Sequence, residues 1–191
     1  MFPVVGKLYC SSSQTKLMVR KRPYVVNGGG FTVLNGRQEV VFIVEGCGSL
    51  GAEGELILKD GDRTPVLFIK EKGGLVQAMS FHNLWNGYLM DFNQPTKLIF
   101  TLREPKQCLV TKSAIKVSLE PNKHWDFEVK GSFIEKSCTI NDRKGDIIAE
   151  VRVNEPINDV YQVVVQPGYD QAFVIGIIAV LDNINGETTR C

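Results

Sequence analysis

Three stretches of this sequence hold residues whose types and spacing suit chemistry. The first, from Gly46 to Gly51, matches the GxGxxG spacing that lets a backbone approach a pyrophosphate at the start of a helix. The residues that follow contain Gly54 and then a run typical of a strand, so the helix that this chemistry needs is missing. We therefore expect a connection between strands here, and no nucleotide cofactor.

The second stretch imitates part of a calcium-binding loop. Asp60, Asp62 and Glu71 occupy the first, third and twelfth positions of such a loop. Thr64 and Pro65 stand where a further ligand and a glycine are required, so we interpret the stretch as a hairpin turn instead.

The third stretch surrounds Cys138, which lies beside Lys136 and could pair with His124 as nucleophile and base. The sequence supplies neither an orienting partner nor an oxyanion hole for such a pair. The five cysteines are widely separated, lack CxxC spacing and accompany only two histidines: Cys10, Cys47, Cys108, Cys138 and Cys191. We expect reduced, buried thiols, with no disulfide framework, no metal site, no cofactor and no catalysis.

The densest positive charge is at Lys16, Arg20, Lys21 and Arg22, four cations within seven residues. Charged side chains commonly protect the edge strand of a sheet, so a solvated edge is the simplest interpretation. The alternative is a site for an anionic lipid headgroup or a phosphate. DNA binding is disfavoured, because the net charge is only +1 and no exposed helix is available to enter a groove.

The elements that would position these residues are almost all strands. From Tyr24 onward, short runs rich in Val, Ile, Phe and Leu alternate with turn residues about every ten positions. Residues 126–133 alternate most clearly, with Phe127, Val129 and Gly131 on the buried face and Glu128 and Lys130 on the wet face. Residues 149–153 alternate in the same way, with Val153 on the buried face and Arg152 on the wet face. We count about twelve candidate strands, including one at 75–81.

One segment departs from this pattern, the uncharged apolar run Ala172–Leu181. Asp170 is placed to cap a helix at about 170–184, and Gly186 lies where one could end. Such a helix is apolar on every face, and its ten uncharged residues rise only about 15 Å, half the thickness of a bilayer core. We therefore expect burial in protein and no transmembrane span.

The fold class follows from combining the two patterns. Half-apolar antiparallel strands must cover something, and this helix is the only all-apolar segment in the chain. We predict an all-β fold with one central helix, a closed antiparallel barrel of about twelve strands around a hydrophobic C-terminal helix. Residues 1–14 are expected to form a loose terminus and residues 15–191 a single domain, in an intracellular protein without a secretory signal.

Several motifs give the chain a family resemblance. They are the stretch from Val26 to Val33, Gly61–Asp62, Trp85, residues 126–133 with Ser137–Cys138, and the pair Asp170–Phe173 and Leu181–Asn185. The chain resembles the plant LURP-one-related family over about 16–185. This resemblance implies a tubby C-terminal-like fold, and kinship with tubby proteins and phospholipid scramblases, some of which engage phosphoinositides or membranes. It also implies a link with plant defence against pathogens, and no established enzymatic activity.

The sequence thus predicts a non-enzymatic barrel that binds phosphoinositide or an acidic membrane and tethers a regulatory partner. Its site would be Lys16, Arg20, Lys21 and Arg22, and its location the cytoplasm, the plasma membrane or the nucleus. The alternative is a protein-interaction scaffold that binds no lipid.

Overall fold

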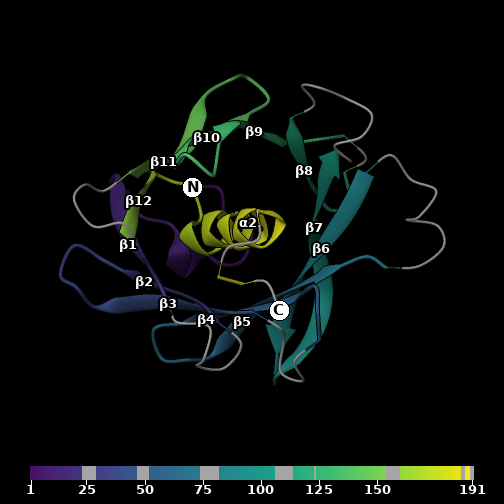
Figure 1. Ribbon diagram of the computed structural model, residues 1–191, viewed down its shortest axis with the longest axis horizontal. Coiled ribbons are helices and arrows are strands. Elements are labelled where there is room, and N and C mark those ends of the chain that lie inside the picture. Colours follow the sequence, from purple (N-terminus) through teal and green to yellow (C-terminus); the bar gives the residue numbers. More distant parts are fainter. Residues whose placement is uncertain are drawn as a thin grey trace.

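The computed structural model of the protein is a ring of strands around one helix (Figure 1). The structure describes residues 1–22, 29–46, 52–73, 82–105, 114–122, 124–153, 160–185 and 188–189. The strand expected at 75–81 and the proposed helix stop at Gly186 lie outside these described residues.

Twelve antiparallel strands of the described residues close into a barrel in which every strand pairs with the next in sequence, and β12 pairs with β1. This confirms the predicted fold class. The strands are β1 (Thr15–Lys21), β2 (Gly30–Leu34), β3 (Val40–Glu45), β4 (Glu55–Asp60), β5 (Pro65–Glu71), β6 (His82–Asp91), β7 (Gln94–Pro105), β8 (Ile115–Leu119), β9 (Phe127–Ser132), β10 (Ser137–Asp142), β11 (Ile147–Val153) and β12 (Val160–Val165).

Helix α2 (Gln171–Ile184) runs through the barrel, as Figure 1 shows. Its 14 residues rise about 21 Å, which matches the height of strands of six or seven residues. Asp170 caps it through a hydrogen bond from the Phe173 backbone N–H, as the sequence predicted. Every residue from Ala172 to Asp182 is buried, so burial in protein is confirmed for this apolar segment.

The direction of α2 distinguishes the two ends of the barrel. The helix begins at the end where β12 finishes and β1 starts, which we call the entry end. It finishes where β1 ends and β2 begins, since Gly30 N–H donates to the Thr188 carbonyl just beyond the helix. We call this the exit end.

Two glycines allow the helix and the barrel wall to approach closely. A Cβ added at Gly176 of α2 would lie 2.6 Å from Leu67 of β5. A Cβ at Gly87 of β6 would lie 2.2 Å from the ring of Phe100, which packs against Phe173 of α2 at a centroid distance of 5.5 Å. The core therefore depends on the absence of side chains at these positions.

The predicted alternation is confirmed along most of β9, where Phe127 and Val129 are buried while Lys130 is exposed. It ends before Gly131, which is exposed and has φ +91°, so this glycine does not share the buried face as the pattern suggested. The hairpin at Asp60 is confirmed as well, because its Oδ1 accepts hydrogen bonds from the backbone N–H groups of Asp62 and Thr64.

The first fourteen residues, expected to form a loose terminus, cross the entry end. They include the short 3₁₀ helix η1 (Lys7–Tyr9). The ring of Phe2 packs against Phe127 at 5.7 Å, and the ring of Tyr9 against Phe42 at 5.6 Å. We refer to residues 1–10 as the N-terminal strap.

Candidate functional site

Strand β1 carries the densest positive charge, and closure of the barrel changes its interpretation. β1 pairs with β12 on one side and with β2 on the other. It is therefore not an edge strand, and the interpretation of its cations as protection of a free edge is wrong. Their presence on a fully paired strand needs another explanation.

The four sequence-predicted cations do not form one cluster. Lys16 and Arg20 are exposed on the outer face of β1, but four residues of extended strand separate their Cα atoms by about 14 Å. Arg20 lies with Lys21 and Arg22 at the exit end, whereas Lys16 lies toward the entry end. The structure thus brings three of the four together and leaves Lys16 apart.

Two further cations lie next to residues of β12. Gln162 of β12 is the register partner of Arg152 on β11. The Nζ of Lys136, in the turn between β9 and β10, lies 4.8 Å from the ring centre of Tyr161 and 3.9 Å from that of Phe133.

Val160 of β12 is the register partner of Arg20, so Arg20 and Arg152 lie toward the exit end on strands that only β12 separates. We call this group the basic corner: Arg20, Lys21, Arg22, Lys136 and Arg152.

Two carboxylates lie within or beside the basic corner. Arg152 Nη2 contacts Glu150 Oε2 at 2.6 Å, and this hydrogen bond, together with the positive charge of Arg152, lowers the pKa of Glu150. Glu135 is exposed in the same turn as Lys136. Among the described residues of the corner there are thus five cations and two carboxylates, and these seven side chains together carry a net positive charge at neutral pH.

Exposed apolar side chains accompany the cations. Ile134, in the turn between β9 and β10, is 69% exposed. Val153 at the end of β11 is 56% exposed, although the sequence pattern put it on the buried face, because its strand ends there at the mouth of the barrel. A surface that combines cations with exposed apolar groups suits an interface between water and lipid.

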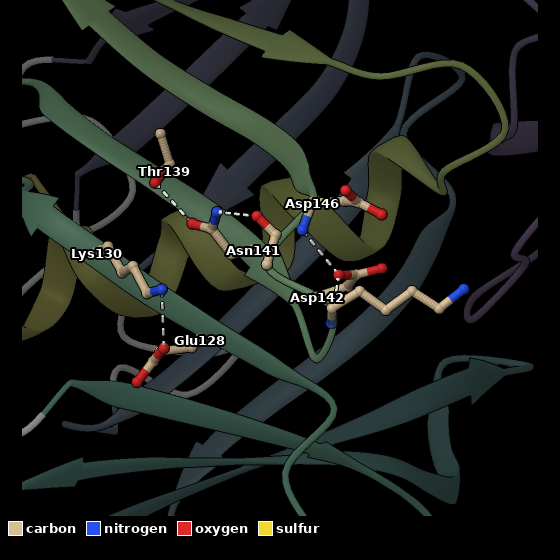
Figure 2. Close-up of polar contacts among 8 residues, drawn as sticks. Glu128, Lys130, Thr139, Asn141, Asp142 and Asp146 are labelled. Atoms are coloured by element: carbon tan, nitrogen blue, oxygen red, sulfur yellow. Dashed lines mark hydrogen bonds and ion pairs between the residues drawn. The ribbon is translucent and has the colours of Figure 1, made fainter.

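The wall beside β11 carries polar groups that bind one another, and Figure 2 shows several of them on β9 and β10. On β9, Lys130 Nζ contacts Glu128 Oε2 at 3.4 Å. On β10, the Thr139 hydroxyl donates to Asn141 Oδ1 at 2.7 Å, and the Asn141 amide donates to the Gly145 carbonyl at 3.1 Å. These groups satisfy one another, so the net positive charge of the corner does not extend along these parts of β9 and β10.

The other motifs that suggested chemistry have structural explanations where the structure describes them. Burial raises the pKa of the Cys138 thiol to about 11 against the opposing effect of Lys136, so this cysteine is not a nucleophile at neutral pH. Gly46 packs so closely that an added Cβ would lie 2.4 Å from the Thr189 carbonyl oxygen. The remainder of the GxGxxG stretch, 47–51, lies outside the described residues.

Sequence reasoning missed Arg152 and Lys136 as members of this site. Arg152 had been assigned to the wet face of its strand, but its neighbour across β12 depends on how the barrel closes. Lys136 follows a strand end and has φ +51°, so its direction does not follow strand alternation. Neither position carried a signal that sequence spacing alone would reveal.

Two general findings limit the chemistry of this site. Within the described residues, no group of three or more His, Cys, Asp or Glu side chains is placed to hold a metal ion. No helix in the same part of the chain has the length and apolar character needed to cross a bilayer.

Comparison with known proteins identifies relatives of the whole chain. Protein LURP-one-related 6 from Arabidopsis thaliana is 49% identical over 192 residues, which cover 100% of both chains. Protein LURP-one-related 16 from the same plant is 44% identical over 205 residues, covering 99% of this chain and 95% of its own.

A solved structure shares the fold. An X-ray structure of a protein from Arabidopsis thaliana superimposes with a TM-score of 0.72 at 24% identity, covering 96% of this chain and 98% of the other. The sequence profile of the LURP-one-related family matches residues 15–182. The chain therefore belongs to the LURP-one-related family.

Proposed function

We propose that this protein binds acidic membrane surfaces, with phosphoinositide headgroups as the preferred ligand, through the basic corner. On this proposal it acts without catalysis, as a barrel that tethers a regulatory partner to a membrane inside plant cells. It would act in the cytoplasm, at the plasma membrane or in the nucleus. A role in plant defence remains a prediction from the family resemblance.

The observation that supports the proposal most strongly is the composition of the corner. Cations lie at the exit end on three neighbouring segments, β1, β11 and the turn before β10, and both β1 and β11 are fully paired strands. Ile134 and Val153 add exposed apolar surface at the same rim. Cations near an anionic surface each contribute about 1 kcal/mol, and buried apolar area adds to this.

Vesicle flotation tests the proposal. Wild-type protein should float with phosphatidylcholine vesicles that contain a few per cent phosphatidylinositol phosphate and should stay in solution with phosphatidylcholine alone. Arg20→Ala/Arg152→Ala removes two cations, so its partition coefficient should fall about 30-fold, from about 1 kcal/mol for each charge. Recovery should also fall as salt is raised toward 0.5 M, because surface charges are screened.

A matched variant controls for net charge. Lys130→Ala/Lys144→Ala removes the same charge from the neighbouring wall and from the turn between β10 and β11, where Lys144 is exposed. Its recovery should equal that of the wild type. Equal recovery of wild type with both kinds of vesicle would refute lipid binding and favour the protein-interaction scaffold, and an equal loss in both double variants would show that only net charge matters.

A further inference from the structure

The entry end of the barrel holds a pocket of about 380 Å³ between the N-terminal strap and the adjoining wall. Lys97 of β7 and Glu120, which follows β8, bring two opposite charges to its lining. We call it the strap pocket. Its volume lies within the range of about 300–1,000 Å³ that is typical of small-molecule sites. Apolar side chains from the strap, β7 and β8 line the rest of it: Phe2, Val4, Ile99 and Leu119.

Hydrogen bonds hold the part of this lining that the strap supplies. Phe2 N–H donates to the Gly168 carbonyl at 2.7 Å, and Val4 N–H donates to Asp170 Oδ2 at 3.0 Å. The ring of Phe2 also packs edge-on against Phe127, yet its side chain stays 44% exposed. The pocket is therefore preformed, and it presents an aromatic ring that can make further apolar contacts.

The two charges of the strap pocket lie near each other without forming an ion pair. Glu120 N–H donates to the Ile99 carbonyl at 2.9 Å, so these two residues face each other across neighbouring strands. Lys97 precedes Ile99 by two residues, which places its Cα diagonally opposite that of Glu120, about 7–8 Å away. Within the part of the chain that the structure describes, neither Lys97 nor Glu120 forms an ion pair.

The Glu120 carboxylate also keeps most of its capacity to accept hydrogen bonds. Its Oε1 lies 3.5 Å from the Thr101 hydroxyl, which lies closer to Asn86 Oδ1, at 3.1 Å. A hydroxyl donates only one hydrogen, so the shorter contact to Asn86 takes precedence. Lys97 and Glu120 are both exposed, so a ligand from solution can reach them.

This combination of groups defines the chemistry of a ligand. An α-amino acid carries an ammonium and a carboxylate on one carbon, so its carboxylate can face Lys97 while its ammonium faces Glu120. Its side chain then enters the apolar part of the pocket, where the exposed ring of Phe2 suits a large or aromatic group. A ligand with only one of the two charges would leave one side chain of the pocket unmatched.

We propose that the strap pocket binds a free α-amino acid with a large apolar side chain. The two charges give recognition, whereas apolar contact gives most of the affinity, because exposed ion pairs contribute little in water. The pocket lies at the opposite end of the barrel from the basic corner, so this proposal does not depend on lipid binding.

Nuclear magnetic resonance of the full-length, ¹⁵N-labelled protein tests the proposal through the backbone amide signals of Ile99 and Glu120. Titration with L-phenylalanine at pH 7 and constant ionic strength should shift both signals saturably, with a dissociation constant on the order of 1 mM. Hydrocinnamate lacks the ammonium and phenethylamine lacks the carboxylate, so each should bind about fivefold more weakly, the loss of one exposed ion pair. Glycine lacks the apolar side chain and should bind at least about thirtyfold more weakly.

Two variants identify the charged groups. Lys97→Gln should weaken L-phenylalanine about fivefold without weakening phenethylamine, and Glu120→Gln should weaken it equally without weakening hydrocinnamate. A variant that merely distorted the pocket would weaken all three ligands. The matched controls Lys144→Gln, in the turn between β10 and β11, and Glu128→Gln, on the outer face of β9, should leave the affinity for L-phenylalanine unchanged.

The proposal is overturned if L-phenylalanine gives no saturable shift, or if glycine, hydrocinnamate or phenethylamine binds as tightly as L-phenylalanine. It is also overturned if Lys97→Gln or Glu120→Gln leaves the affinity for L-phenylalanine unchanged, or weakens all three ligands alike.

Discussion

The carboxylate of Asp170 binds both helix α2 and the N-terminal strap. Its removal should therefore lower the stability of the protein strongly. The side chain has no exposed surface. Its Oδ1 caps α2 through Phe173 N–H at 3.1 Å. Its Oδ2 accepts hydrogen bonds of 3.0, 2.8 and 3.0 Å from three backbone N–H groups of the N-terminal strap, those of Val4, Val5 and Gly6.

The expected loss for Asp170→Ala follows from these four hydrogen bonds. A hydrogen bond to a charged group contributes about 1.5–3 kcal/mol, and loss of a helix N-cap costs about 1 kcal/mol. The strap N–H groups become hydrated once the strap detaches, so their contributions do not add in full. We therefore expect a fall in the free energy of unfolding of about 3–5 kcal/mol. Asp170→Asn retains one acceptor oxygen and should lose about 2 kcal/mol.

Urea denaturation of four proteins measures the coupling: the full chain, Asp170→Ala, a chain lacking residues 1–6, and the combination. In the shortened chain only the N-cap remains, so Asp170→Ala should cost about 1 kcal/mol there. The coupling energy should therefore be about 2–4 kcal/mol.

The matched control is Asp146→Ala, an exposed aspartate at the same end of the barrel. This change should alter stability by no more than about 0.5 kcal/mol. An equal loss from Asp170→Ala in the full and shortened chains would refute the reasoning, and would mean that residues 1–14 behave as the loose terminus that the sequence predicted.

Three further predictions follow from buried groups. Ile177→Lys places an unpaired charge on the fully buried face of α2 and should prevent folding, as shown by loss of the cooperative melting transition, whereas Val153→Lys at a 56% exposed position should fold normally. Glu104→Gln should raise the melting temperature at pH 7. The raised folded-state pKa of Glu104 means that its contribution to stability is present below its ordinary pKa of about 4.5 and is lost as pH rises through the folded value, so the difference should vanish in acid. Cys138, with a pKa of about 11, should be roughly a thousandth thiolate at pH 8 and should react with iodoacetamide far more slowly in folded than in urea-unfolded protein.

The barrel could be predicted from the sequence because its main forces leave periodic patterns. Alternation of period two identified β9, and the turn residues at Asp60 identified a hairpin. The apolar run of α2 has no polar face, so a helix there must be buried in protein or in lipid. Because the run is too short to cross a bilayer, burial inside a ring of strands was the prediction that remained. Each inference rests on local sequence, and each was confirmed.

The N-terminal strap could not be predicted, because its anchor leaves no pattern in the side chains. The groups that bind Asp170 are the backbone N–H groups of residues 4–6. Backbone N–H groups of this kind occur in nearly every residue type, so composition does not reveal them. The cap role of Asp170 was visible from its position before the helix, but its second role depends on contacts more than 160 residues away.

The basic corner was hidden for a different reason. It depends on the register between strands, and register is set by how the whole barrel closes. Arg152 reaches the corner only because β12 separates β11 from β1. Glu71 likewise influences the pKa of Glu104, 33 positions away, only because β6 alone separates their strands.

The residues that carry the family resemblance also explain why that resemblance predicts fold better than activity. Phe127, Val129 and Phe173 are buried, and Asp170 fastens the helix and the strap. These residues hold the barrel closed around α2 whatever the barrel binds.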